Sequence, residues 1–133
     1  MRRLFYIFSL LALSSVTLTP TAFAAGGGGT PYFEIATPFV VNITNEGGAA
    51  FLQVNAQFKV KNVELKQHLS SHLPAIQHTV MMVLSEQTAS GIRTVKGKQK
   101  LREVTLKEIQ EFLTAQIGDP IVEEIYFTGF IIQ

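Results

Sequence analysis

The chain has 133 residues, no cysteine and a formal net charge of +1 at pH 7. This length fits a single domain, and the 47% of hydrophobic residues can supply its core. The lack of cysteine excludes disulfide bonds and thiol chemistry, and the near-neutral charge gives no argument for nucleic acid as a partner.

The first 24 residues have the parts of a cleavable signal peptide. Arg2 and Arg3 are followed by an apolar run over residues 4–13, and a small-residue motif ends at Ala24, so we expect cleavage before Ala25. The apolar run is short for a membrane span of about 20 residues. An uncleaved anchor in the inner membrane, with a periplasmic domain, is the alternative. Cleavage would leave 109 residues with a net charge of −1, exported across the inner membrane.

Residues 25–30 are predicted to be a linker, because four consecutive glycines have too much backbone entropy to join a regular element. The domain is expected to cover residues 31–133. It opens with short apolar strands at 32–35 and 39–43, each preceded by a proline. Turn residues then lead into a strand at 51–60, which predicts a hairpin. Alternation in this last strand predicts that its core-facing residues are Leu52, Val54, Ala56, Phe58 and Val60.

The apolar period then becomes helical. Asn62 is the predicted N-cap of a first helix, and Pro74 fits the first turn of a second. Residues 88–91 are predicted to end that second helix. Its predicted apolar stripe comprises Ile76, Val80, Val83 and Leu84.

A third helix is predicted over residues 97–117, with Gly118 just beyond its end. Thr105 and Glu108 match a capping box, which predicts a break near Thr105. The predicted inner face of this helix comprises Leu101, Ile109, Phe112, Leu113 and Ile117.

The last segment, residues 123–133, is predicted to be a strand that pairs with the strand at 51–60, which would tie down the end of the chain. Strict alternation places Ile125, Phe127 and Ile131 on one face, and Tyr126, Phe130 and Ile132 on the other. Either a second element buries the outer face, or a second copy of the protein covers that face or the strand edge. Strands, about three helices and a closing strand together predict an α+β fold with one small sheet.

No catalytic, cofactor or metal site is predicted. His68 and His72 have the helical spacing of a metal-binding pair, but His78 lies on another segment and no further ligand is evident. No serine has the context of a nucleophile elbow. Glu123 and Glu124 are adjacent, so on a strand they would point to opposite faces rather than form a catalytic pair.

Residues 93–102 hold five basic side chains and no acid. Acidic residues would be the usual choice at the start of a helix, because the helix dipole favours them there. A solvated helix start is one interpretation. The other is a basic patch for an anionic partner, with Lys96, Lys98 and Lys100 as candidate contacts.

Four segments of the chain are distinctive: PFVVNI at 38–43, LPAIQHTVMMVLSEQT at 73–88, GKQKLREVTLKEIQEFL at 97–113 and VEEIYFTGFIIQ at 122–133. Together they resemble the FliL family of flagellar basal-body-associated proteins. They occur in the family's order, and the last is the most specific. By this resemblance, Phe127, Phe130 and Gln133 are further candidate partner contacts.

The resemblance implies a domain similar to the stomatin and prohibitin (SPFH-like) domain, without enzymatic activity or cofactor. It implies a homo-oligomeric ring in the periplasm at the flagellar basal body, with the MotA/MotB-type flagellar stator as its partner. It implies no nucleic acid, and membrane contact only at the periphery unless the N-terminal segment is uncleaved. The alternative is a periplasmic SPFH-like ring or scaffold protein with no flagellar role.

The sequence departs from the family in two places. Family members usually carry an uncleaved anchor, so the cleavable-looking signal implies a soluble member that acts beside an anchored family member. The family also often has an Arg-Asp pair where this chain has Gln77 and His78. A contact made by that pair therefore does not carry over to this chain.

Overall fold

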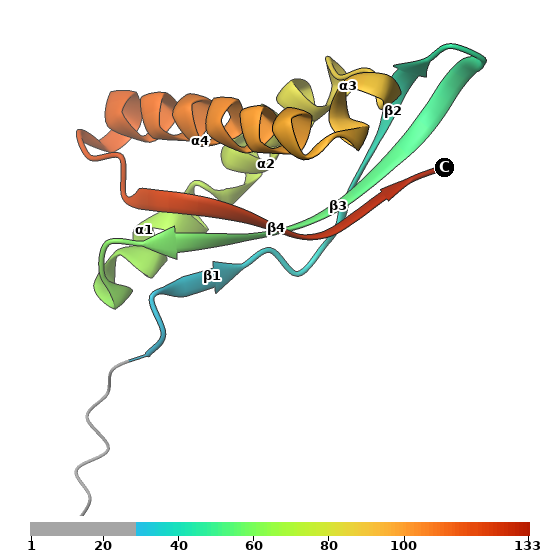
Figure 1. The fold of residues 1–133 in the computed structure, drawn as a ribbon. Coiled ribbons are helices and arrows are strands. Elements are labelled where there is room, and N and C mark those ends of the chain that lie inside the picture. Colours follow the sequence, from blue (N-terminus) through green and yellow to red (C-terminus); the bar gives the residue numbers. More distant parts are fainter. Residues whose placement is uncertain (1–28) are drawn as a thin grey trace, which may run out of the picture.

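The computed structural model describes residues 29–133; the predicted signal peptide (1–24) and most of the predicted linker (25–30) lie outside the described residues. The α+β prediction is confirmed: helices pack on one face of an antiparallel sheet (Figure 1). The strands are β1 (Tyr32–Glu34), β2 (Phe39–Asn45), β3 (Gly48–Val60) and β4 (Val122–Ile132). The helices are the 3-10 turn η1 (Val63–Leu65), α1 (Lys66–Ser71), α2 (Leu73–Ser85), α3 (Ala89–Arg93) and α4 (Val95–Ile117).

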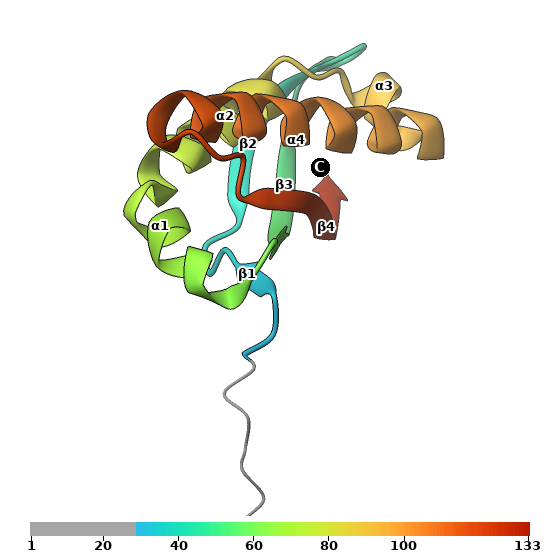
Figure 2. The same cartoon turned by 90° about the vertical axis from the view of Figure 1, so that its left-hand side faces the viewer.

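The long strand β3 is the centre of the sheet. β1 and β2 pair with one of its edges, and β4 pairs with the other (Figure 2). Backbone hydrogen bonds show the two edges of β3. On one edge, the carbonyl of Ala56 accepts a hydrogen bond from the N–H of Ile35, just after β1. On the other edge, Phe51 and Gln133, the residue after β4, exchange two backbone hydrogen bonds. The predicted pairing of the terminal strand with the strand at 51–60 is confirmed.

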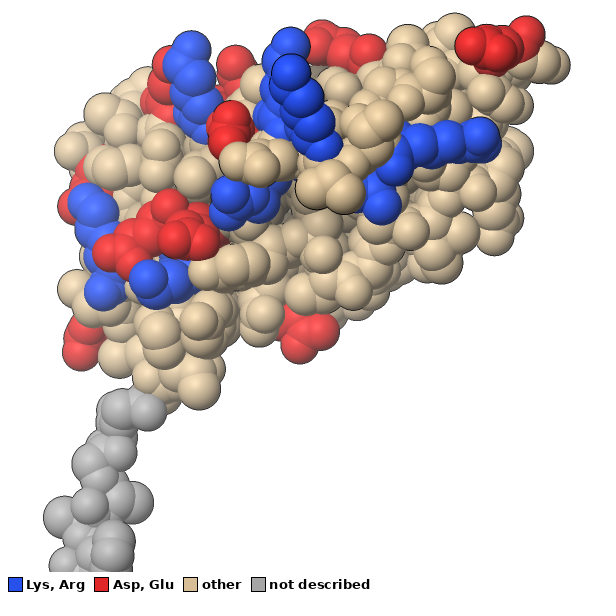
Figure 3. Space-filling view, viewed as in Figure 1, with Lys and Arg blue, Asp and Glu red and all other residues tan. Residues whose placement is uncertain are grey.

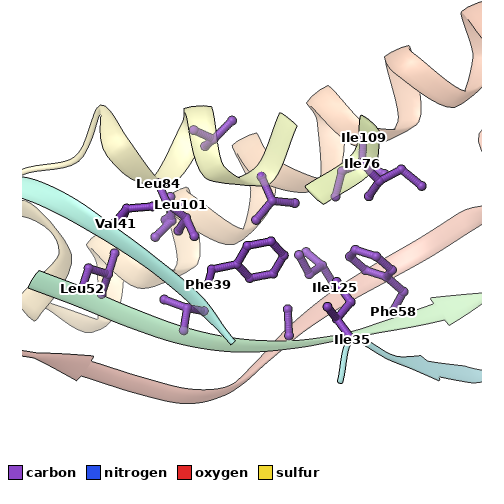
Figure 4. Close-up of a cluster of buried hydrophobic side chains, with 14 of the residues drawn as sticks. Ile35, Phe39, Val41, Leu52, Phe58, Ile76, Leu84, Leu101, Ile109 and Ile125 are labelled. Atoms are coloured by element: carbon purple, nitrogen blue, oxygen red, sulfur yellow. The ribbon is translucent and has the colours of Figure 1, made fainter. Parts of the chain in front are cut away.

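The predicted alternation in β3 is also confirmed. Its five predicted core residues are at most 2% exposed and face the helices. They pack with the α2 stripe and with Leu101 and Ile109 of α4 (Figure 4). Because the side-chain period of a strand is two, a register slip of one residue would move this whole set to solvent, so the alternation fixes the register.

The helix starts were largely predictable. Asn62 Oδ1 accepts a hydrogen bond from the backbone N–H of Leu65, and Pro74 lies in the first turn of α2. The prediction that residues 88–91 end the second helix is wrong. α2 already ends at Ser85, and Thr88 begins α3 by accepting from the N–H of Gly91. Thr94 caps α4 in the same way, so the fold has more helices than predicted.

The predicted break near Thr105 is wrong as well, because α4 is continuous from Val95 to Ile117. Thr105 is fully buried, and its hydroxyl donates to the carbonyl of Leu101 at 2.7 Å. This bond within the helix satisfies the hydroxyl, so the side chain does not cap a new helix start. Gly118 ends α4 as predicted, with a left-handed φ of 76°.

The faces predicted for the terminal strand are wrong in part. β4 has a bulge where Asn55 pairs with Gly129 and the next pair is Ala56 with Phe127. The extra residue, Thr128, reverses the alternation, since a bulge places two residues opposite one. The helix-facing side of β4 therefore carries Ile125, Phe127, Phe130 and Ile132, whereas Tyr126 and Ile131 share the other face. A second register shift, between the pairs Lys59–Glu124 and Val60–Val122, places Val122 on the helix-facing side as well.

The turn between α4 and β4 is fixed by Asp119. Its carboxylate accepts from Lys61 Nζ at 2.7 Å and from the backbone N–H of Ile121 at 2.8 Å. Ile121 is buried with a φ of 52°, which is unfavourable for a β-branched residue. The hydrogen bond from Lys61 and then that from Ile121 hold the pKa of Asp119 below its ordinary value of 3.8.

Asp119→Asn is expected to lower the stability at neutral pH and to make little difference in acid. A carboxyl whose pKa is lowered by folding stabilises the protein above its ordinary pKa, and this contribution is lost as the pH falls through the lowered value. Urea unfolding of both proteins between about pH 6 and pH 3 measures the difference. A difference that stays constant over this range would contradict the assignment.

Candidate functional site

A groove lies between α4 and the edge of β4. It has a volume of about 530 Å³, and we call it the α4–β4 groove. Figure 3 shows basic side chains over α4 on this side of the molecule, with acidic side chains and uncharged surface between them. The groove is lined by Val95, Lys98, Gln99 and Arg102 from α4, and by Tyr126, Phe127 and Phe130 from β4.

Both walls of the groove follow from local structure. The α4 residues are spaced by three, four and seven positions, so they form one stripe on the helix surface. The bulge at Thr128 brings Phe127 and Phe130 to the same face of β4, with ring centroids 6.2 Å apart. A regular strand would have separated the two rings.

The groove combines aromatic surface with positive charge. Lys98 Nζ lies 4.9 Å from the ring centroid of Phe130, which is cation–π geometry. Arg102 is 3.8 Å from the carboxylate of Glu124, at the other end of the groove. Glu124 accepts a hydrogen bond from the hydroxyl of Tyr126 at 2.6 Å, and this bond, followed by burial, raises the pKa of Tyr126.

The structure brings together three of the six predicted contact residues, since Lys98, Phe127 and Phe130 line the same groove. The other three, Lys96, Lys100 and Gln133, are exposed outside it. The sequence prediction missed four lining residues: Val95, Gln99, Arg102 and Tyr126. Val95 and Arg102 lie three and four positions from Lys98, and Gln99 lies four positions from Val95. This helical spacing could have indicated the residues of α4 that share a face with Lys98.

A second surface lies on the sheet face opposite the helices. Val40, Phe51 and Ile131 are 56%, 57% and 46% exposed. Gln53 of β3 pairs with Val40 of β2 on one side and with Ile131 of β4 on the other. Phe51 lies two positions before Gln53 in β3, so it is on the same face of the strand. We call these three residues the outer sheet patch. Exposed apolar side chains clustered in this way are typical of protein–protein contacts.

The remaining candidates do not form a site. His68 and His78 are exposed, and the ring of His72 lies edge-on to Phe112 with centroids 6.3 Å apart. Among residues 29–133, no three histidine or acidic residues form a group that could hold a metal ion. Glu123 pairs with Lys59 at 3.0 Å, and this contact raises the pKa of Lys59, whereas Glu124 contacts Tyr126 and Arg102.

The described helices were also compared with the requirements for membrane insertion. Across the part of the chain that the structure describes, none is both long enough and apolar enough to span a membrane.

Comparison with known proteins gives consistent matches. Residues 32–133 match the family model described as flagellar basal body-associated protein FliL. The flagellar protein FliL of Aquifex aeolicus (strain VF5) is 27% identical over 101 residues, which are 76% of this chain and 60% of the relative. That of Escherichia coli (strain K12) is 24% identical over 108 residues, 78% of this chain and 66% of the relative. The chain thus spans less than two thirds of the length of these relatives.

Proposed function

This chain belongs to the FliL family of flagellar basal body-associated proteins, and on that premise we propose that it is a non-enzymatic accessory protein of the flagellar motor. In this proposal it forms an oligomer in the periplasm and supports the engagement or the stability of the MotA/MotB-type stator. It acts either as a soluble protein beside an anchored family member or through its own N-terminal anchor.

The observation that carries the proposal is the extent of the family match. It begins at the first residue of β1 and ends at the last residue of the chain, so it includes every helix and strand described above. The FliL family is a family of flagellar accessory proteins and not a known enzyme family. The match favours a flagellar role over a periplasmic scaffold without one.

The outer sheet patch supports the oligomeric part of the proposal. In the described structure, no helix lies below the end of the sheet that holds the β2–β3 hairpin and the C-terminus (Figure 1). Contact with another copy would remove the three apolar side chains from water, at about 25 cal/mol for each Å² buried. Gln53 lies between Val40 and Ile131 and would be buried with them, whereas the exposed Asn55, two positions further along β3, would suit the rim of such a contact.

Phe51→Glu is expected to weaken self-association strongly while leaving the fold stable, because Phe51 is 57% exposed. A charge at the centre of an apolar contact has to be buried without a partner. Sedimentation velocity of the purified chain over a range of concentrations measures the effect.

Met81→Glu is the matched control, since Met81 is 43% exposed on α2, in the helix layer. It should leave self-association unchanged. Equal loss in both variants, or none in Phe51→Glu, would contradict the role of the patch. The flagellar part of the proposal is tested separately, by the motility of a strain that lacks the chain.

A further inference from the structure

We infer that the α4–β4 groove binds an extended, acidic segment of another polypeptide, which adds as a strand to the free edge of β4. The inference goes beyond the proposed function, because it assigns a recognition mode to a groove that self-association through the outer sheet patch does not use. It rests on the free strand edge, the aromatic β4 wall and the charge of the groove.

The free edge is the first observation. In the structure from residue 29 onward, β4 pairs only with β3. Figure 2 shows no further strand on its other side. The side chain of Gln110 on α4 donates to the carbonyl of Val122 at 2.8 Å, so the beginning of this edge is covered. Beyond Val122 the edge is a template for another strand.

The register identifies the backbone groups that such a strand would meet. The backbone N–H and C=O of Gln133 both bond to Phe51, so Gln133 directs these groups toward β3. In an antiparallel ladder such pairs alternate with pairs that are not hydrogen-bonded, and the β4 residues of the latter direct their N–H and C=O groups away from β3. The outward residues are Ile125, Phe127, Phe130 and Ile132, which pair with β3 residues whose own groups point toward β1 and β2.

The β4 wall of the groove, with Phe127 and Phe130, suits apolar side chains of the added strand. Phe127 and Phe130 are partly buried and still line the groove, and the 84% exposed side chain of Val95 stands on the opposite wall. Alternate side chains of an extended segment would enter the groove, because the side chains of a strand alternate between its two faces.

Charge identifies the rest of the partner. Lys98 has no carboxylate within 4 Å among the described residues, and Arg102 has only the 3.8 Å contact with Glu124. Five basic residues and no acid occupy positions 93–102. Acidic residues in the bound segment would therefore find one cation without an acidic partner, Lys98, and one that is only loosely paired, Arg102. A second copy of this chain, joined through its own β4 edge, would instead bring its Lys98 and Arg102 toward Lys98 and Arg102 of the first copy. Repulsion between these like charges disfavours a second copy as the occupant.

A random 12-residue peptide library displayed on phage tests the inference on the full chain in mild detergent. Selection should enrich peptides that combine acidic with apolar residues. The best synthetic peptide should bind Lys98→Glu/Arg102→Glu at least about tenfold more weakly than the unchanged chain. The double variant Lys96→Glu/Lys100→Glu has the same change in charge on the same helix outside the groove, and should change the Kd by less than about threefold.

A second measurement does not depend on folding of the variants. The selected peptide is resynthesised with N-methyl groups on alternate residues, in both possible phases. One phase should abolish binding and the other should not, since only alternate N–H groups of an added strand donate to β4.

Three outcomes would overturn the inference. They are enrichment of no peptide, equal effects of the two double variants, and equal tolerance of both N-methylated phases. Binding through Lys98 and Arg102 to vesicles of phosphatidylcholine with phosphatidylglycerol, without any enriched peptide, would assign the groove to a lipid surface instead. A negative result would leave a load-dependent motility defect unaffected, so it is distinguishable from failure of the proposed function.

Discussion

Gly97→Ala is expected to lower the free energy of unfolding by about 2–4 kcal/mol. A Cβ atom at this position would lie 1.8 Å from the carbonyl oxygen of Gly91 and 2.9 Å from its carbonyl carbon. Both are backbone atoms of α3, so no side-chain rotation can relieve the overlap. The substitution has to push α3 away from the first turn of α4, which the hydroxyl of Thr94 caps through the N–H of Gly97 at 2.9 Å.

The matched control is Gly47→Ala in the loop between β2 and β3. A Cβ atom there would meet nothing within 4 Å, so we expect a change of less than about 1 kcal/mol. Urea unfolding followed by far-UV circular dichroism measures both variants. Equal stability of Gly97→Ala and Gly47→Ala would show that α3 and α4 are not packed as closely as described.

Ile125→Ala is expected to cost about 2–5 kcal/mol, as other large-to-small substitutions in protein cores do. Ile125 is fully buried, and it pairs with the equally buried Phe58 of β3. It also faces the helix layer, so its removal leaves a cavity between β4 and the helices. This position shows that the last strand belongs to the core of the domain.

Ile131→Ala is the matched control, because it makes the same chemical change in the same strand. Ile131 is 46% exposed on the opposite face, so we expect a loss below about 1 kcal/mol. The difference between the two variants tests the bulge directly. Strict alternation would place both isoleucines on one face, and similar losses at the two positions would contradict the register of β4.

The features that sequence reasoning predicted correctly are those with local causes. The alternation in β3 repeats over five buried residues, and a period of two is incompatible with a helix. Asn62, Pro74 and Gly118 each act within a few residues of their own position. The break expected near Thr105 does not form, because a threonine hydroxyl can either cap a helix or bond within it, and the burial of Thr105 favours the bond within the helix.

The α4–β4 groove was less predictable, because it depends on contact between segments that are distant in sequence. The sequence indicates Lys98 by its charge and Phe130 by the family resemblance, and only the packing of α4 over β4 places Lys98 Nζ 4.9 Å from the ring centroid of Phe130. The bulge that aligns Phe127 with Phe130 had one available signal. Gly129 lies in the interior of β4, and a glycine inside a strand often marks a bulge.

The most direct test of the flagellar role is the swimming speed of a deletion strain as the viscosity of the medium is raised. We expect near-normal speed in dilute medium and a loss that grows with viscosity, because the support of the stator that we propose would matter most under load. The wild-type gene should restore the speed. Unchanged speed at every viscosity, in a strain that also lacks any anchored family member, would contradict a role for this protein at the flagellar motor.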